Sequence, residues 1–166
     1  KWLRAGRGTG FARFSERARE RIRPVLSGIT GTTADGLFVD ALPEPASTAQ
    51  AFTVSQPDHL AAVRLAAGVQ EIRDVGVTAI EGRIGEHVDT ILQIADRAGI
   101  PVASPREGAR RAGIVSLAPA DPERFAGALR DVGLAFTARA GAVRLAPHAG
   151  TDAETLRMLD DAVSAF

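Results

Sequence analysis

The sequence of 166 residues contains no cysteine. Without cysteine the chain has no disulfide bond, no thiolate ligand for zinc and no cysteine nucleophile. It also lacks any apolar run approaching the roughly 18–20 residues that a membrane-spanning helix needs. Its first residues do not follow the charged-then-apolar order of a signal peptide. These absences predict a soluble protein of the cytoplasm whose chemistry does not depend on a thiol.

An excess of charge of one sign is also missing. The 20 Lys and Arg residues balance the 20 Asp and Glu residues. Proteins that bind nucleic acid or an anionic membrane through charge carry a basic excess, so we expect neither partner. The three histidines, His59, His87 and His148, are dispersed without the spacing of metal ligands, and no metal site is expected. We expect His87 to lie on the polar side of a helix.

Lysine is nearly absent as well. Lys1 is the only lysine among the basic residues, and all the others are arginine. Only an amine with a tunable pKa can form an imine, so Lys1 is a candidate catalytic residue; a solvated surface lysine is the alternative. Three glycines follow closely, Gly6, Gly8 and Gly10, and they favour a tight turn or a close approach of backbone to a ligand. Because the chain begins with Lys, we expect a fragment that lacks an upstream portion.

The first part of the sequence predicts helices separated by an irregular stretch. We expect a helix over residues 15–26 with Ser15 as its N-cap, and largely extended, irregular structure over residues 29–58 because this stretch is rich in Gly, Thr, Pro and Ser. Asp58 then caps a helix whose apolar residues keep a rough helical period, which predicts a well-buried helix.

The later part predicts a long helix followed by a compact alternation of strands and helices. Apolar residues repeat every three or four positions over residues 78–98, and Gly99 ends that helix before an extended stretch at 100–102. The remaining elements are expected at residues 112–117 (strand), 122–132 (helix), 134–138 (strand), 142–146 (strand) and 151–166 (helix). Thr151 and Glu154 form a candidate capping box for the last helix. The pattern predicts a small α+β layer whose sheet is covered on one side by two helices.

Arg144 lies within the apolar strand pattern VRLAP. Alternation along a strand would bury Val143 and Leu145 on one face and direct Arg144 to the other. An arginine that projects from a strand beside a cleft is suited to binding a carboxylate through two parallel hydrogen bonds. An ordinary exposed arginine is the alternative.

Four segments of the sequence, taken in order, carry a family resemblance: KWLRAGRGTGFARF, FTVSQPDHLAAVRLAAGV, RAGIVSL and VRLAPHAGTDAETL. They resemble the class V aminotransferase group of fold-type-I pyridoxal-phosphate (PLP) enzymes, which includes kynureninases, cysteine desulfurases, C–S lyases and epimerases. The resemblance covers essentially the whole chain. It implies the C-terminal portion of such an enzyme, starting at the cofactor lysine.

The resemblance implies a fold of the α/β plus α+β class, divided into two parts. Residues 1–77 would be the tail of the large α/β PLP-binding domain, with an extended interface segment. Residues 78–166 would be the connecting helix and a small C-terminal α+β domain with an antiparallel sheet.

The resemblance also implies roles for individual residues. Lys1 matches the lysine that forms a Schiff base with pyridoxal 5'-phosphate and then shuttles a proton. Arg144 matches the arginine that grips the α-carboxylate of a small amino-acid substrate. Ser55 and Gln56 lie in a stretch that in this group reaches across the interface of a homodimer with shared active sites. It implies that Ser55 and Gln56 bind the cofactor and that Gln56 also contacts the substrate.

The missing cysteine bears on the reaction. Desulfurases of this group carry a persulfide cysteine on a loop just before the carboxylate arginine, whereas here residues 137–143 run almost directly into Arg144. The resemblance therefore favours cleavage of an amino-acid side chain by a PLP enzyme, either kynureninase-like or C–S lyase-like. An aminotransferase or epimerase of the same group is an alternative. A non-catalytic fragment or interaction module is another, and any activity is expected to need the upstream portion.

Overall fold

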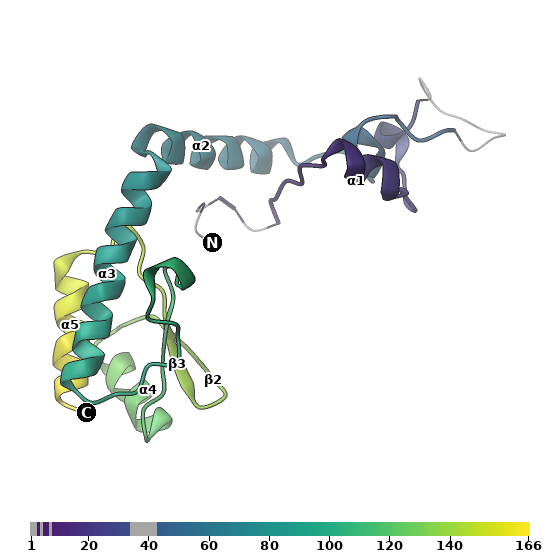
Figure 1. Ribbon diagram of the computed structural model, residues 1–166. Helices are drawn as coiled ribbons and strands as arrows, with labels where there is room; N and C mark the ends of the chain where they lie inside the picture. Colours follow the sequence, from purple (N-terminus) through teal and green to yellow (C-terminus); the bar gives the residue numbers. More distant parts are fainter. Residues whose placement is uncertain (1–2, 4, 7, 34–42) are drawn as a thin grey trace. The chain divides into compact units, whose positions relative to one another are not determined.

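The computed structural model describes residues 3, 5–6, 8–33 and 43–166 (Figure 1). The chain divides into two compact units, one within residues 3–71 and the other spanning residues 72–166. The division falls inside helix α2 (His59–Val75). The predicted domain boundary between residues 77 and 78 stays a prediction.

The first unit is largely irregular, as predicted for much of its length. Ser15 caps α1 (Glu16–Arg21), and its hydroxyl accepts a hydrogen bond from the Ala18 amide. This helix is shorter than predicted, because Pro24 sterically disfavours the helical conformation at the residue before it. Two short 3₁₀ turns follow, η1 (Ile29–Gly31) and η2 (Ala49–Phe52).

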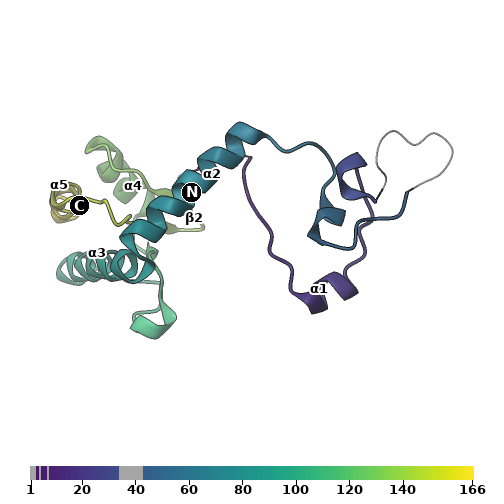
Figure 2. The ribbon, with the colours of Figure 1, turned by 90° about the horizontal axis from the view of Figure 1, so that it is seen from above.

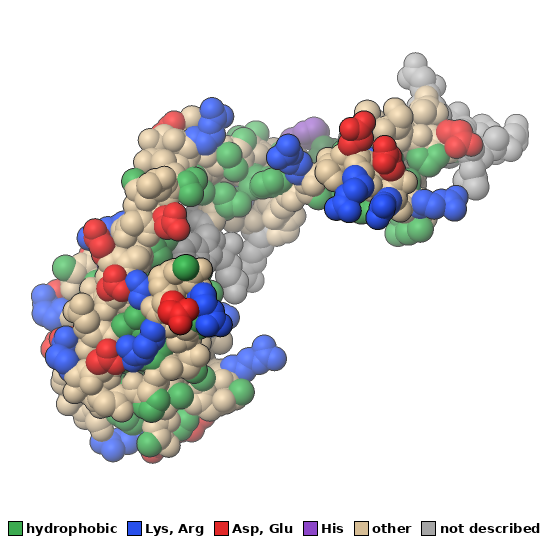
Figure 3. Space-filling view, viewed as in Figure 1, with side chains coloured by type: hydrophobic (Ala, Val, Ile, Leu, Met, Phe, Trp, Pro, Cys, Tyr) green, Lys and Arg blue, Asp and Glu red, His purple; other side chains and the backbone are tan. Residues whose placement is uncertain are grey.

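Helix α2 begins where the sequence predicts, but its expected burial is wrong. Asp58 Oδ1 accepts a hydrogen bond of 3.0 Å from the Ala61 amide, which confirms the N-cap. None of the residues of α2 is buried, and Leu60 and Val63 are 60% and 65% exposed. Figure 3 shows apolar side chains at the surface along this helix. Apolar spacing makes a helix face suited to burial, but burial also requires an element packed against that face.

The second unit is a three-stranded antiparallel sheet with helices on one face (Figures 1 and 2). Its strands lie in the order β1 (Val115–Leu117), β3 (Ala142–Leu145), β2 (Thr137–Arg139). Its helices are α3 (Val77–Arg97), α4 (Pro122–Asp131) and α5 (Ala153–Ser164), with a 3₁₀ turn η3 (Gly108–Arg110) before β1. This arrangement confirms the predicted small α+β unit with an antiparallel sheet.

The core of the second unit involves three helices rather than the predicted two. Val115 and Val143 from the sheet and Phe125 of α4 are buried in the same core. Helix α3 supplies six buried apolar residues to the same core, and α5 supplies three. The long helix therefore belongs to the sheet's cover instead of serving only as a connection.

Other boundaries and contacts in this unit differ from the prediction. Strands β1 and β2 each begin three residues later than expected. Asp152, not Thr151, caps α5: its Oδ1 accepts from the Thr155 amide at 2.8 Å. The Thr151 hydroxyl instead accepts a hydrogen bond from the His148 amide at 2.9 Å, so it is engaged in the turn before the helix.

The predicted polar position of His87 is wrong. The residue is only 2% exposed, on the face of α3 that packs into the core. Its Nε2 atom is buried and has no hydrogen-bond partner in the described part of the chain. Residues three or four apart lie on one face of a helix, so His87 shares the buried face of Ile84 and Ile91 although its imidazole is polar.

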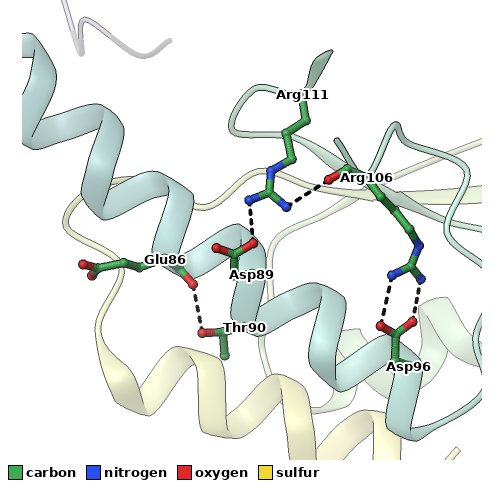
Figure 4. Close-up of polar contacts among 6 residues, drawn as sticks. All are labelled: Glu86, Asp89, Thr90, Asp96, Arg106 and Arg111. Atoms are coloured by element: carbon green, nitrogen blue, oxygen red, sulfur yellow. Dashed lines mark hydrogen bonds and ion pairs between the residues drawn. The ribbon is translucent and has the colours of Figure 1, made fainter. Parts of the chain in front are cut away.

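The segment between α3 and β1 is fastened to α3 by two ion pairs (Figure 4). Arg106 donates to both carboxylate oxygens of Asp96, at 3.0 and 2.5 Å, and Arg111 donates to Asp89 at 2.5 Å. The hydrogen bond from Arg106 lowers the pKa of Asp96. Val102 bridges to Leu117, so the predicted extended stretch runs beside β1.

Among the described helices, none combines the length and apolar character needed to cross a bilayer.

Candidate functional site

Arg144 occupies the middle strand of the sheet, on the face opposite the helices. Val143 and Leu145 are buried while Arg144 is exposed, which confirms the predicted orientation of this strand. In the strand register Arg144 pairs with Ser116 of β1 on one side and with Thr137 of β2 on the other. Directly opposed residues in a sheet project on the same face. Ser116 and Thr137 therefore project on the same face of the sheet as Arg144.

Within the described residues, the contacts of Arg144 leave most of its hydrogen-bonding capacity unused. Its Nη2 donates one long hydrogen bond, 3.5 Å, to Thr137 Oγ1. Among the described residues no carboxylate lies within ion-pair distance of it. A guanidinium offers five N–H donors in a planar fork that matches a carboxylate. This arrangement is suited to an incoming carboxylate.

The tight turn between β2 and β3 sets this geometry. Ala140 and Gly141 connect the two strands, and both have positive φ angles, 52° and 75°. Two-residue turns with positive φ at both positions match the twist of antiparallel strands. The turn pairs Arg139 with Ala142 and Thr137 with Arg144. It also leaves no longer loop in front of Arg144, as the sequence predicts.

Ser55 and Gln56 lie in the first unit, just after η2, and both side chains are exposed. Neither forms a hydrogen bond with the described part of the chain. The preceding turn is fastened by stacking of Phe52 on Phe14, with ring centroids 4.4 Å apart and planes 10° from parallel. The hydroxyl and amide groups of this stretch are therefore available to a ligand.

The remaining predicted site residue, Lys1, lies outside the described residues. Ser55 and Gln56 belong to the first unit and Arg144 to the second, so each is placed only within its own unit. In the described part of the chain, His, Asp and Glu side chains form no group of three or more that could hold a metal ion.

Sequence reasoning missed three neighbours of Arg144: Ser116, Thr137 and Arg139. Their signal was present in the alternation of T-A-R before the Ala140–Gly141 turn, which places Thr137 and Arg139 on one face of β2. The pairing of Ser116 with Arg144 joins strands far apart in sequence, so it needed the tertiary structure.

Comparison with known proteins gives matches among solved structures. No protein-family model matches the sequence, and no curated protein matches it. An apo cysteine desulfurase from Thermococcus onnurineus NA1 is 23% identical, with a TM-score of 0.74 over 91% of this chain and 42% of that chain.

Two further matches are structures of the cystine C–S lyase C-DES, each 17% identical over 92% of this chain. One is its complex with the reaction product cysteine persulfide, with a TM-score of 0.77 and 41% of that chain covered. The other is a lysine-to-alanine mutant with glycine covalently linked to the PLP cofactor, with a TM-score of 0.78 and 40% of that chain covered. This chain thus spans about two-fifths of the length of these solved chains. Its fold is that of a C-terminal part of a fold-type-I PLP enzyme.

Proposed function

We propose that this chain belongs to a PLP-dependent enzyme that cleaves the side chain of an amino-acid substrate, in the manner of a C–S lyase. The observation that carries the proposal is the position of Arg144, exposed at the centre of the sheet's open face with no acidic partner among the described residues. The fold shared with a cystine C–S lyase supports it.

In this proposal Arg144 binds the α-carboxylate of the substrate. The planar fork of a guanidinium fixes both the position and the orientation of a carboxylate, which a single point charge does not. Thr137 helps to hold the guanidinium above the sheet through its hydroxyl. Fixing the carboxylate limits how the neighbouring carbon can be presented to the reacting groups.

The donor groups of the chain fit PLP as the cofactor. Lys1, as the only lysine, is the one side chain able to form an imine with the cofactor's aldehyde. The Ser55 hydroxyl and the Gln56 amide are exposed and unbonded within the described chain, and hydroxyl and amide groups suit phosphate oxygens. When bound, PLP withdraws electrons from the carbon that carries the substrate's amino group. Lys1 would move the proton at that carbon.

The absence of cysteine favours a lyase over a desulfurase that passes sulfur to a protein thiol. The sequence has no thiol, and the two-residue turn before Arg144 leaves no loop that could carry one. Sulfur released from the substrate would therefore leave with a small-molecule product. Kynureninase-like cleavage is the alternative that a specific observation favours: Ser55-Gln56-Pro57 resembles the Ser-Asn-Pro that kynureninases carry in the corresponding stretch, with Gln in place of Asn.

The proposal includes a homodimer in the cytoplasm. In the dimer, the stretch around Ser55 would reach the active site of the neighbouring subunit. Two features support this arrangement: the exposure of Ser55 and Gln56, and the exposed apolar residues Leu60 and Val63 in the adjoining helix.

The test uses the polypeptide that carries this chain, incubated with PLP. We expect the absorption of a protein imine, which borohydride abolishes, and we expect mass spectrometry of the reduced protein to find the pyridoxyl group on Lys1. A Lys1→Ala variant that keeps the imine spectrum contradicts the proposal. Product analysis separates the reactions, because a C–S lyase releases a 2-oxo acid and ammonia, whereas kynureninase-like cleavage releases alanine.

A further inference from the structure

We propose that Arg139 binds a second anionic group of the substrate while Arg144 binds the α-carboxylate, so that the preferred substrate is an amino acid with a second, distal carboxylate. The inference rests on the proposed function for the role of Arg144. It adds a specificity-determining residue and a substrate class to it.

Both arginines project from the open face of the sheet. Thr137 is paired with Arg144, so these two residues share a face. Arg139 lies two residues beyond Thr137 on β2, and residues two apart on a strand share a face. The helices cover the opposite face, where Val143 and Leu145 are buried. The two guanidinium groups therefore occupy one surface without an intervening helix.

The geometry brings the two arginines near each other. Arg139 is paired with Ala142, and Arg144 lies two residues further along β3. Such diagonal neighbours lie about 7–8 Å apart across an antiparallel pair, within reach of long side chains. The hydrogen bond to Thr137 also draws the Arg144 guanidinium towards β2, the strand that carries Arg139.

Within the described part of the chain, no acidic side chain pairs with either of these two arginines. Six ion pairs involve arginine in the described residues, and neither Arg139 nor Arg144 takes part in any of them. Two like charges side by side repel each other unless an anion lies with them. An anion that satisfies both guanidinium groups is therefore bound more strongly than one that meets a single group.

A ligand with two carboxylates suits this spacing better than a ligand with one. Each guanidinium can form its own pair of hydrogen bonds with a carboxylate. With two separate carboxylates, each arginine can form its own pair of hydrogen bonds at the spacing set by the strands. A single carboxylate would have to accept hydrogen bonds from both guanidinium groups at once. The turn at Ala140 and Gly141 fixes this spacing, because it sets the register of the two strands.

The test measures binding of unreactive acids by calorimetry to the PLP-treated polypeptide that carries this chain. Glutarate and adipate are the dicarboxylate probes, and valerate and hexanoate are monocarboxylates of matched length. We expect each dicarboxylate to bind about tenfold more tightly than its matched monocarboxylate, the size of one charge-assisted contact. Equal affinities, or no binding of either acid, overturn the proposal.

Three variants assign the effect to residues. Arg139→Gln should weaken dicarboxylate binding about tenfold and leave monocarboxylate binding unchanged, whereas Arg144→Gln should weaken both. Arg157→Gln is the matched control, because Arg157 is an exposed arginine of α5 paired with Glu154, and it should change neither. If Arg139→Gln weakens both acids equally, the two arginines share one carboxylate and the proposal is wrong. Arg139→Lys, which keeps the charge, should restore part of the dicarboxylate preference.

The outcome is separable from that of the proposed function. If no imine forms on Lys1 but the dicarboxylate preference depends on Arg139, the proposed function fails and the two-arginine site stands. If the imine forms and dicarboxylates bind no better than monocarboxylates, the function stands and the second site is wrong. In the active enzyme, Arg139→Gln should raise KM only for amino acids with a distal carboxylate.

Discussion

Thr137 lies directly opposite Arg144 in the antiparallel pairing of β2 and β3, and its hydroxyl accepts the hydrogen bond that Arg144 Nη2 donates at 3.5 Å. The pairing depends on the turn at Ala140 and Gly141, since a shift of one residue would place Thr137 on the other face. A hydroxyl from one strand thus orients a guanidinium on the next. This relationship makes Thr137 a positioning residue for the proposed carboxylate site.

Replacement of Thr137 by valine keeps the shape of the side chain but removes the acceptor. We expect KM for the amino-acid substrate to rise about threefold with kcat unchanged, because the lost hydrogen bond is long and exposed. The Thr137→Ser variant keeps the hydroxyl acceptor, so its KM should equal that of the original protein. A purely structural role of Thr137 would not require this result. A valine variant with unchanged KM contradicts the positioning role.

Ala140 is the only described residue other than glycine with a positive φ angle, 52°. This conformation is unfavourable for alanine and is well tolerated by asparagine, which is common at this position of such turns. We expect Ala140→Asn to raise the free energy of unfolding by about 0.5–1 kcal/mol, measured by urea denaturation. Gly141→Ala, at φ 75°, is the converse control and should lower it. A lower free energy of unfolding for Ala140→Asn would contradict the prediction that the positive φ angle of Ala140 destabilises the fold.

His87 buries a polar atom without a partner in the described part of the chain. Its Nε2 is buried and unbonded, and the residue is 2% exposed. Loss of hydration without a compensating hydrogen bond costs about 1–3 kcal/mol. We expect His87→Leu to raise the melting temperature, and His59→Leu, at an exposed position of α2, to leave it nearly unchanged. A lower melting temperature for His87→Leu would mean that the imidazole has a partner in the protein.

Asp96 should titrate differently in the folded and unfolded protein. The side-chain hydrogen bond from Arg106 lowers the pKa of Asp96, and the Arg106 charge acts in the same direction. A carboxyl group with a lowered pKa stabilises the fold above the pKa of the unfolded group, about 3.9. That contribution is lost as the pH falls through the lower pKa of the folded state.

The measurement is an NMR titration of the Asp96 carboxyl carbon. Arg106→Gln should raise the pKa of Asp96 towards its ordinary value. The matched control is Asp152, whose pKa is lowered by hydrogen bonds from Thr155 and not by Arg106. Its titration should be the same in the variant. An unchanged pKa for Asp96 in Arg106→Gln would show that the ion pair does not persist in solution.

Local patterns in the sequence identify most elements of the second unit. Helical apolar spacing marks α3 to within one residue at each end, and strand alternation predicts the burial of Val143 and Leu145 and the exposure of Arg144. These predictions succeed because period and side-chain direction are properties of the local backbone. The N-caps at Ser15 and Asp58 succeed for the same reason.

The sequence-based predictions are wrong where the burial or the hydrogen bonding of a residue depends on parts of the chain that are distant in sequence. The apolar spacing of α2 resembles that of a buried helix, yet no residue of α2 is buried. The sequence predicts the side chain of His87 on the polar side of its helix, yet it is buried because the face of α3 that carries it packs into the core. Thr151 has a sequence suited to capping, but Asp152 caps the helix and the Thr151 hydroxyl binds the His148 amide instead.

The sequence by itself determined the absence of a thiol, the rarity of lysine, and the strand that directs Arg144 away from the core, because composition and alternation do not depend on the fold. Only the tertiary structure decided what surrounds that arginine. The register of three strands placed Ser116 and Thr137 beside it, and the turn placed Arg139 on the same face. Strand register arises from pairing between separate segments, and no pattern within one segment contains it.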